Sequence, residues 1–583
     1  MSAAIKAAPV EGFRYSGTVG HRIAASLKRH GVTHVFAQSL PSMVLLPCAE
    51  LGIQQVAYRA ENTGGYMADG FARASQKVGV VTSQNGPAAA LLVAAFGEAL
   101  AASIPMVALL QEVNRDQADR NAFQESDQIA TFSPCSKWVR RVTEASRIED
   151  YIDMAFTIAA TGRPGPAVLL LPADLLTEPA KPSLLPRNSQ LGFYPLDRTA
   201  PDPERLREAA KAVAASSAPV IIAGGGVHLS DASAELAALQ ESCGIPVGTT
   251  VMGKGAVDEG HPLSLGVVGY FMGEGGASRH QRALIEGADL VILVGNRTNQ
   301  NGTDSWQLYP KNARYLHIDV DGAEIGRNYD ALRLVGDARL ALRALREALG
   351  VEDLDRHRAR RPELERRIAA AKDAYRKDVA GIIDSDRSPI RPERVLAEMD
   401  AVLTPDSIFV ADASYSSIWA ANCLHSRRAG QRFLAPRGLA GIGWGLPMAL
   451  GAKAARPDAP VLCLVGDGGF AHAWSELETS VRMRLPVTLV VLNNQVLGYQ
   501  MHSERVRFGV HTPANELGPV DHAMIARACG CEAVRVEKAA DLGPALRRAA
   551  QSKVTTLIDV ITDPEARPPL TVFEGQFPPI PRG

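Results

Sequence analysis

The chain has 583 residues, of which 46% are hydrophobic and 21% charged, an ordinary composition for a globular protein. This length exceeds what one hydrophobic core supports and predicts three or four domains. A formal net charge of −1 gives no electrostatic basis for binding nucleic acid or an anionic membrane, and no apolar run is long enough to cross a bilayer. The N-terminal segment MSAAIKAAPVEGF contains no apolar secretory stretch, so we expect a cytoplasmic protein. The seven scattered cysteines are expected to be buried free thiols rather than zinc ligands.

Helical and strand patterns alternate along the first domain, which we place at residues 1–185. Helices are expected over 18–30, 62–74 and 88–102, and strands over 32–36, 54–57, 78–82, 107–110 and 167–171. This alternation predicts a doubly wound α/β domain with a parallel sheet. A segment rich in Pro and polar residues follows and is expected to be a linker.

A second α/β domain is expected over 200–350, with strands at 219–227, 288–295 and 313–321. Gly224-Gly225-Gly226 follows the first of these strands. It is compatible with a dinucleotide site, and equally with a tight turn, because the full G-x-G-x-x-G pattern is absent. Residues 351–388 are expected to form a linking helix. Asp and Glu alternate with Arg there, which favours a solvated helix over a nucleic-acid contact.

The third domain is expected over 389–565, also α/β, and a Pro-rich tail at 566–583 is expected to be an extended arm on the surface. Its strands are predicted at 407–411, 461–465, 487–492 and 556–560.

One βαβ unit of the third domain carries polar residues at both strand ends. Gly466-Asp467-Gly468-Gly469 is predicted to be a tight turn between strand 461–465 and a helix that runs to about 483, and Asn493-Asn494 ends strand 487–492. Parallel strands end at the same edge of a sheet, so Asp467 and Asn494 should face each other there. Their oxygens are hard ligands of the kind Mg²⁺ takes, and the glycines let backbone N–H groups approach an anion. The pattern predicts a Mg²⁺–diphosphate site, with an ordinary polar turn as the alternative.

Gly-Asp-Gly followed by Asn-Asn, with 27 positions between Asp467 and Asn494, resembles the signature of thiamine-diphosphate enzymes of the acetohydroxyacid synthase and decarboxylase family. The resemblance extends along nearly the whole chain. It implies three doubly wound domains, called pyrimidine-binding, central and diphosphate-binding. It also implies that Asp467, Asn494 and the carbonyl of Val496 hold Mg²⁺, and that the diphosphate lies against the glycines Gly466, Gly468 and Gly469.

Two further segments match the same family. Residues 60–73, AENTGGYMADGFAR, place Glu61 at the position of the family's catalytic Glu, which hydrogen-bonds the aminopyrimidine ring. The alternative for Glu61 is a carboxylate that interacts with the dipole of the helix that follows it. Residues 438–447, GLAGIGWGLP, place Ile442 as the wedge that bends the cofactor and the carbonyl of Ala440 as the acceptor for its amino group. The alternative for Ile442 is a core aliphatic residue.

The resemblance also assigns residues outside these segments. Pro87, in Asn85-Gly86-Pro87, matches a loop near the pyrimidine, and Gln111 matches a residue that faces the substrate. Hydroxyl groups after strand 407–411 could bind diphosphate or cap a helix: Ser414, Tyr415 and Ser416. His472, five residues after Asp467, could point toward the thiazolium ring or be structural.

The chain departs from the family where the substrate is selected. The loop expected over the reacting carbon, which includes Gln38 and Ser39, is one residue longer than the family's, and Ser503 stands where acetohydroxyacid synthases have a Trp. The family's flavin element is altered at 296–301, although Asp321 and Asp337 could still meet an FAD. The sequence is therefore compatible with FAD as a further cofactor but does not establish it.

The resemblance implies an enzyme that uses thiamine diphosphate and Mg²⁺ to form or break carbon–carbon bonds of 2-oxo acids. An acetolactate-synthase-like ligation is preferred. The alternatives are a 2-oxo acid decarboxylase, a 2-hydroxyacyl or 2-hydroxyacyl-CoA lyase, and a non-catalytic homologue. Since Glu61 and Asp467 belong to different domains, the resemblance also implies a homodimer or homotetramer with active sites shared between subunits.

Overall fold

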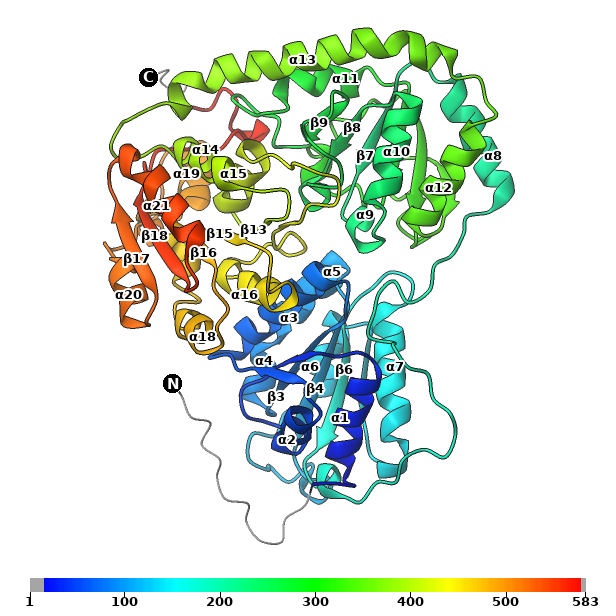
Figure 1. Ribbon diagram of the computed structural model, residues 1–583, viewed down its shortest axis with the longest axis vertical. Coiled ribbons are helices and arrows are strands. Elements are labelled where there is room, and N and C mark those ends of the chain that lie inside the picture. The colour runs from blue at the N-terminus through cyan, green and yellow to red at the C-terminus, as the bar shows by residue number, and fades with distance from the viewer. Residues whose placement is uncertain (1–14, 578–583) are drawn as a thin grey trace.

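The computed structural model describes residues 15–577, and within them the chain forms three domains, each built on a six-stranded parallel sheet. In Figure 1 the first domain lies below, the second at the upper right and the third at the left. The α/β architecture expected from the sequence is confirmed. The segment MSAAIKAAPVEGF, on which the cytoplasmic expectation rests, and the last six residues of the C-terminal arm lie outside the described residues.

The first domain has the strand order β2-β1-β3-β4-β6-β5. Its strands are β1 (His34–Phe36), β2 (Gln54–Val56), β3 (Gly79–Ser83), β4 (Met106–Glu112), β5 (Trp138–Arg141) and β6 (Ala167–Pro172). Its α-helices are α1 (Val19–Arg29), α2 (Ser42–Glu50), α3 (Glu61–Ser75), α4 (Pro87–Leu91), α5 (Val93–Ala102), α6 (Gln128–Phe132) and α7 (Ile148–Ala160). The single helix expected over 88–102 is interrupted at Leu92, which lies between α4 and α5.

The second domain has the order β12-β11-β10-β7-β8-β9. Its strands are β7 (Pro219–Ala223), β8 (Val247–Thr249), β9 (Ser264–Val267), β10 (Leu290–Val294), β11 (Arg314–Asp319) and β12 (Leu332–Val335). Its helices are α8 (Pro203–Ala215), α9 (Gly226–Leu229), α10 (Ser233–Cys243), α11 (Arg282–Glu286) and α12 (Ala338–Leu349). The charged helix expected after this domain is α13 (Asp355–Ile383), which runs across the top of Figure 1 to the third domain and buries Leu364 and Ile368.

The third domain has the order β14-β13-β15-β16-β18-β17. Its strands are β13 (Ile408–Ala411), β14 (Phe433–Leu434), β15 (Val461–Gly466), β16 (Thr488–Asn493), β17 (Glu532–Val536) and β18 (Thr556–Ile561). Its helices are α14 (Pro392–Val402), α15 (Tyr415–Cys423), α16 (Gly445–Ala455), α17 (Asp467–Phe470), α18 (Glu476–Arg482), α19 (Gly498–Phe508), α20 (His522–Ala528) and α21 (Ala539–Gln551).

Two local predictions in the third domain are wrong. Strand β15 ends at Gly466 and α17 starts directly at Asp467, so the Gly-Asp-Gly-Gly segment is the first turn of a helix rather than a tight turn. The helix expected to run to about residue 483 is broken between α17 and α18. The C-terminal arm is not confined to the surface either, because its apolar side chains Ala566, Leu570 and Phe573 are buried against the third domain.

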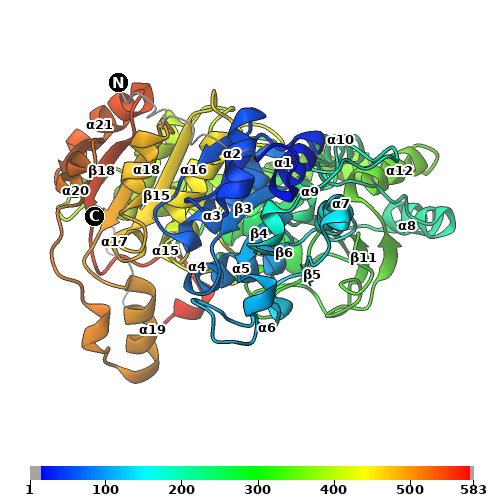
Figure 2. The ribbon, with the colours of Figure 1, turned by 90° about the horizontal axis from the view of Figure 1, so that it is seen from below.

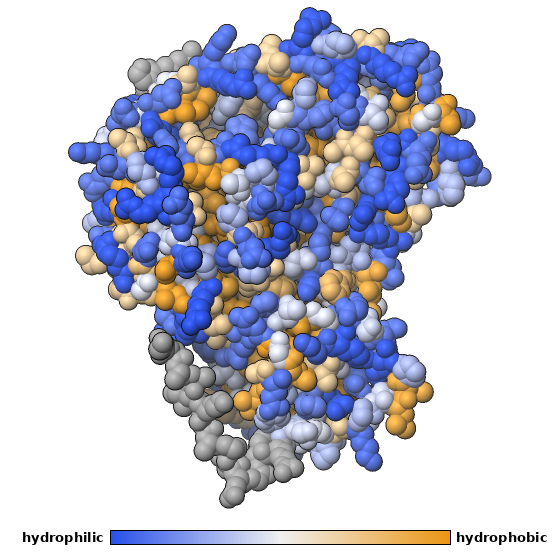
Figure 3. Space-filling model, viewed as in Figure 1, coloured by the Kyte–Doolittle hydropathy of each residue, from blue (hydrophilic) through white to orange (hydrophobic). Residues whose placement is uncertain are grey.

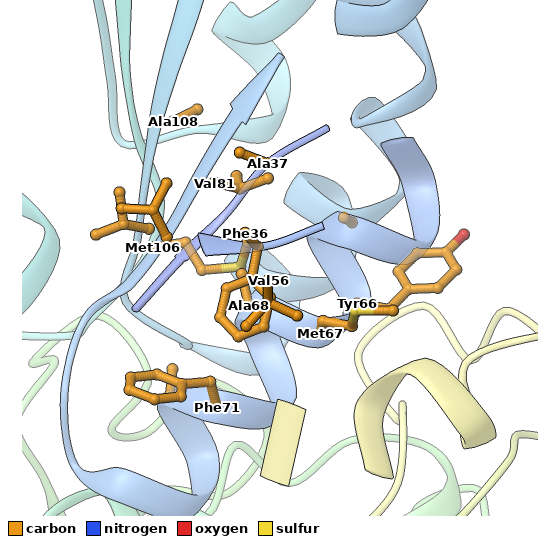
Figure 4. Close-up of a cluster of buried hydrophobic side chains, with 14 of the residues drawn as sticks. Phe36, Ala37, Val56, Tyr66, Met67, Ala68, Phe71, Val81, Met106 and Ala108 are labelled. Carbon is orange, nitrogen blue, oxygen red and sulfur yellow. The ribbon is translucent and has the colours of Figure 1, made fainter. Parts of the chain in front are cut away.

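Helices α3 and α16 join the first domain to the third, and they lie side by side in both ribbon views (Figure 1 and Figure 2). In Figure 4, Met67, Ala68 and Phe71 of α3 lie with Phe36, Val56 and Val81 of the first sheet, while Tyr66 points away from that core. The other face of α3 meets α16 so closely that a Cβ on Gly70 would lie 2.2 Å from the carbonyl oxygen of Met448, and one on Gly451 only 1.9 Å from that of Met67. These two glycines therefore allow the two helix backbones to touch.

Figure 3 shows a mostly hydrophilic face on which hydrophobic residues are scattered in small patches. Within the described residues, no helix combines the length and the apolar character that crossing a bilayer requires. All seven cysteines are free thiols; Cys423 and Cys529 are half-buried and the other five are buried.

Candidate functional site

The carboxyl ends of β13, β15 and β16, which are neighbours in the third sheet, open onto a cavity of about 210 Å³. Strands of a parallel sheet present their following loops at one edge, which is where α/β domains bind ligands. Ten residues that the sequence singled out line this cavity: Ser414, Tyr415, Ser416, Ile442, Gly466, Asp467, Gly468, Gly469, Asn494 and Val496. Tyr499 and Gln500 of α19 and Ala566 of the C-terminal arm complete its wall.

Asp467 is the buried acid of this cavity, with 6% of its surface exposed. Its Oδ2 accepts the backbone N–H of Gln495 at 2.7 Å, and its Oδ1 accepts that of Gly468 at 2.9 Å. Burial raises the pKa of Asp467 to about 6, although these two N–H donors oppose the shift. The carboxylate of Asp559 adds to the rise in this pKa. A buried carboxylate in such surroundings is suited to a metal ion.

The predicted metal ligands supply oxygen atoms only. The Asn494 Oδ1 accepts the N–H of Val496 at 3.2 Å, and Gln495 between them has a φ of +59°, which turns the chain back toward Asp467. Among the described residues no group of three or more His, Cys, Asp and Glu side chains could hold a metal. A metal at this edge would therefore rely on one carboxylate, one amide and one carbonyl, a hard-oxygen set that fits Mg²⁺.

Ser414, Tyr415 and Ser416 line the same cavity at the start of α15. Ser414 occupies the N-cap position, but its side chain makes no capping hydrogen bond and its φ is +62°. Of the two alternatives for these hydroxyl groups, the helix cap therefore does not apply to Ser414. The Tyr415 hydroxyl is held 2.8 Å from Nδ1 of His502, and burial lowers the pKa of His502 to about 4, which keeps that ring neutral.

The segment that carries Ile442 is fixed by Asp412, at the end of β13. The Asp412 carboxylate accepts the N–H groups of Gly443 at 2.9 Å and Trp444 at 3.0 Å. Burial raises the pKa of Asp412, and these backbone donors oppose the shift. Ile442 lines the cavity, whereas Ala440 is exposed, has a φ of +63° and does not line it.

His472 is exposed and does not line the cavity. Its Cβ lies close to Gly443, where an added Cβ would approach it to 2.7 Å.

The first domain brings a second set of predicted residues to the carboxyl edge of its own sheet. Glu61 is the first residue of α3 and is half-buried. Gln38, after β1, donates from Nε2 to the carbonyl of Arg59 at 3.2 Å, so the loop of Gln38 and Ser39 lies against the turn that carries Glu61. These three predicted residues are neighbours in the structure.

Pro87 and Gln111 lie farther along the same edge. Pro87 is exposed and begins α4, and Gln111 is half-buried near the end of β4. Neither these residues nor Gln38, Ser39 and Glu61 line the cavity that holds Asp467. Within one chain the predicted residues thus form two separate groups.

A second cavity, of about 140 Å³, lies between the central domain and its neighbours. It is lined by the glycine turn after β7 and by polar residues at or after the ends of β10, β11 and β12: Gly224, Gly225, Gly226, Asn296, Arg297, Asp319, Glu324 and Asp337. The Asn296 Nδ2 is buried without a hydrogen-bond partner among the described residues. Burial raises the pKa of Asp319 to about 6 and lowers that of Arg297. These features suit a polar ligand such as a nucleotide.

Of the two acids expected to meet a flavin, only Asp337 lines this central cavity, where it also caps α12 and pairs with Arg198 at 2.8 Å. Asp321 does not line it and lies 3.6 Å from Arg163. The reason is that β11 ends at Asp319, two residues before the predicted strand end, so Asp319 takes the place expected of Asp321.

Sequence reasoning alone does not identify three buried acids near these sites: Asp412, Glu98 and Glu476. Each of them binds backbone N–H groups, and such contacts leave no motif in the sequence. For Glu98, a charged residue among the apolar positions of VAAFGEALAA is the one signal that the sequence offers.

Family models match all three domains. The N-terminal thiamine pyrophosphate (TPP) binding domain matches residues 17–131, the thiamine pyrophosphate enzyme central domain matches 206–345, and the C-terminal TPP binding domain matches 412–560. The chain belongs to the thiamine pyrophosphate enzyme family. The two sheet edges described above are those of its N-terminal and C-terminal cofactor-binding domains.

Curated relatives of this thiamine pyrophosphate enzyme extend over most of its length. A probable acetolactate synthase large subunit of Methanococcus aeolicus is 33% identical over 87% of this chain and 85% of its own. One of Methanocaldococcus jannaschii is 34% identical over 95% and 93%. An acetolactate synthase of Arthrospira platensis is 31% identical over 92% of each chain. The chain is a thiamine-diphosphate-dependent enzyme similar to acetolactate synthase.

Proposed function

We propose that this enzyme uses thiamine diphosphate and Mg²⁺ to decarboxylate a 2-oxo acid and to join the remaining fragment to a second carbonyl compound, as an acetolactate-synthase-like transferase. The observation that carries the proposal is the single cavity at the third sheet edge. It unites the buried acid Asp467, the amide of Asn494, the carbonyl of Val496 and the turn of Ser414. The similarity to named acetolactate synthases supports the choice of reaction.

Different residues of the cavity would hold different parts of the cofactor. Asp467, Asn494 and the Val496 carbonyl would bind Mg²⁺, and the metal would neutralise the diphosphate. Ile442 would shape the cofactor, because Asp412 fixes the backbone on its C-terminal side. When bound, thiamine diphosphate supplies a carbon nucleophile and an electron sink for the decarboxylation. The protein contributes position and a cavity wall that includes Trp419 and Leu492.

Glu61 would act as the acid that shares a proton with the aminopyrimidine ring. It does not line the cavity of its own chain. We therefore infer that Glu61 of one copy completes the cavity of a second copy. The minimum active unit is then a homodimer, and a homotetramer would contain two such dimers. Gln38, Ser39 and Gln111 lie at the same sheet edge as Glu61, so they would face the substrate.

Incubation of the purified enzyme with thiamine diphosphate, Mg²⁺ and a panel of 2-oxo acids tests the reaction. We expect CO₂ release together with ligated products. Release of CO₂ with aldehyde and no ligated product would identify a decarboxylase, and cleavage of 2-hydroxyacyl thioesters would identify a lyase. Sedimentation of the loaded enzyme tests the dimer. An active monomer would contradict the shared site.

We also propose that the central cavity binds the adenine-containing part of FAD. The glycine turn 224–226, the unpartnered Nδ2 of Asn296 and the guanidinium of Arg297 support this assignment within the described chain. Absorption spectra of purified protein reconstituted with FAD test it, and Arg297→Ala should weaken flavin binding. Unchanged flavin affinity in that variant would count against this cavity.

A further inference from the structure

Glu476, the first residue of α18, is a fully buried carboxylate that reaches from the third domain into the first. It accepts the N–H of Arg59 at 3.1 Å, the N–H of Ala60 at 3.2 Å and the hydroxyl of Thr63 at 2.6 Å. These three donors surround Glu61. Glu476 therefore holds the turn from which Glu61 projects.

This turn has no capping residue of its own. Helix α3 begins at Glu61, and Ala60 at its N-cap position has no side chain that could accept a hydrogen bond. A buried backbone N–H without a partner is costly. Glu476, from another domain, accepts the N–H groups of Arg59 and of Ala60, the two residues before the helix, with hydrogen bonds strengthened by its charge.

Glu98 makes the reverse connection, from the first domain into the third. It lies on α5, is 1% exposed, and accepts the N–H groups of Gly438 at 2.7 Å, Leu439 at 2.5 Å and Ala440 at 3.2 Å. Arg73 approaches the same carboxylate at 3.4 Å. These three N–H groups belong to the turn that leads to Ile442. Ala440 has a φ of +63°, a conformation that a non-glycine residue adopts only when its surroundings impose it.

We propose that Glu476 and Glu98 are reciprocal positioning residues: each domain uses one buried carboxylate to fix the turn through which the other domain meets thiamine diphosphate. Glu476 sets the placement of Glu61, and Glu98 sets that of Ala440 and Ile442. This proposal rests on the proposed function, because only that function gives the two turns a role in binding thiamine diphosphate. Neither carboxylate contacts the reacting atoms, and both act through the backbone.

Glu476 accepts its hydrogen bonds mainly at one carboxylate oxygen, whereas Glu98 accepts them at both, so a Gln substitution should affect the two residues differently. All three donors around Glu476 reach Oε1, and Oε2 receives only a second, longer contact from Arg59 at 3.3 Å. Glu476→Gln keeps one oxygen and should retain most of these bonds. Glu98 uses both oxygens, Oε1 for Gly438 and Oε2 for Leu439 and Ala440. Glu98→Gln would place an NH₂ group against an N–H and should release part of the turn.

The first measurement is hydrogen–deuterium exchange on the protein without cofactor. Glu476→Ala should speed exchange in a peptide covering 57–64, and Glu98→Gln should speed exchange in a peptide covering 436–442.

The second measurement is performed on the holoenzyme and records cofactor affinity and the rate of proton exchange at C2 of thiamine diphosphate. Glu476→Ala should lower the C2 exchange rate about 10²-fold, the loss typical of a catalytic group displaced by about 1 Å, with cofactor affinity nearly unchanged. Glu98→Gln should mainly weaken cofactor affinity.

Glu259→Gln is the matched control, since Glu259 is a buried carboxylate that joins the central and third domains through the N–H of Ser426 at 2.8 Å. This control variant should lower thermal stability without changing C2 exchange.

If Glu476→Ala does not fold, Thr63→Val removes one of the hydrogen-bond donors to Glu476 at nearly constant side-chain volume. Glu476→Gln should keep C2 exchange near the wild-type rate. A folded Glu476→Ala or Thr63→Val enzyme with wild-type C2 exchange would overturn the role of Glu476, and unchanged affinity in Glu98→Gln would overturn that of Glu98. A wild-type protein that binds no thiamine diphosphate would instead refute the proposed function.

Discussion

Tyr66 of α3 stacks on Trp444, the residue before α16, with ring centroids 3.8 Å apart and planes 21° from parallel. The contact joins the first domain to the third, and Tyr66 turns away from its own domain's core to make it (Figure 4). Helix α3 begins at Glu61, and α16 follows the segment of Ile442. The packing of these two helices therefore sets where the segments of Glu61 and Ile442 lie relative to each other.

Gly451→Ala should disrupt this packing. The new Cβ would lie 1.9 Å from the carbonyl oxygen of Met67, and backbone atoms of a packed helix cannot move aside cheaply. We expect a loss of about 3 kcal/mol in the free energy of unfolding or failure to fold, measured by thermal and urea unfolding. Gly518→Ala is the control, because no described atom lies within 4 Å of the point that its Cβ would occupy and its backbone has no left-handed φ. Equal stability of the two variants would contradict the close approach.

Asp467→Ala should abolish Mg²⁺-dependent binding of thiamine diphosphate. It removes the only carboxylate among the three predicted metal ligands, and the amide and carbonyl that remain carry no charge to offset the cation. Titration calorimetry with and without Mg²⁺ measures the loss. Asp458→Ala, at an exposed position of the same domain, should bind as the wild type does. Retention of Mg²⁺-dependent binding in Asp467→Ala would place the metal elsewhere.

Glu61→Gln should bind the cofactor with nearly wild-type affinity and exchange the C2 proton more slowly by about 10²–10⁴-fold, the usual contribution of a positioned acid or base. The amide keeps the size of the side chain but cannot share the proton. Exchange of C2 deuterium followed by NMR gives the rate. A wild-type exchange rate would remove Glu61 from the proposed mechanism.

His317→Gln should reduce the loss of stability on acidification. His317 is 1% exposed on β11, and burial lowers its pKa to about 4, with Arg333 adding to the shift and a backbone hydrogen bond with Asn296 opposing it. Between pH 6.5 and 4 the unfolded chain binds a proton at this residue that the folded chain does not, so folding stability falls as pH falls through this window.

Unfolding midpoints at pH 7 and pH 4.5 for the wild type and His317→Gln isolate this contribution, because the other titrating groups are shared by both proteins. The difference between the two proteins should change by about 2 kcal/mol across this range. An identical pH dependence would mean that His317 titrates in the folded protein as it does in the unfolded chain.

The central strands and the residues at their carboxyl ends could be predicted from the sequence. β6, β10 and β15 are buried along their length, so they are continuous apolar runs, and Asp467 and Asn494 are conspicuous as polar residues at the ends of such runs. Five of the six strands that were not predicted lie at sheet edges: β5, β9, β12, β14 and β17. Edge strands are short and partly solvated, and they lack that continuous apolar signal.

What the sequence alone determined was therefore local: three α/β domains, the polar ends of β15 and β16, and a helix start next to Glu61. Only the tertiary structure decided which of these parts meet. Glu476 and Thr63, 413 positions apart, share a hydrogen bond, and Asp412 binds backbone groups that no side-chain motif reveals. It also decided that Glu61 and Asp467 lie in separate groups within one chain. The physical reason is that periodicity records which face of an element is buried, whereas contacts between domains depend on backbone donors and helix crossings, which leave no pattern in a single sequence.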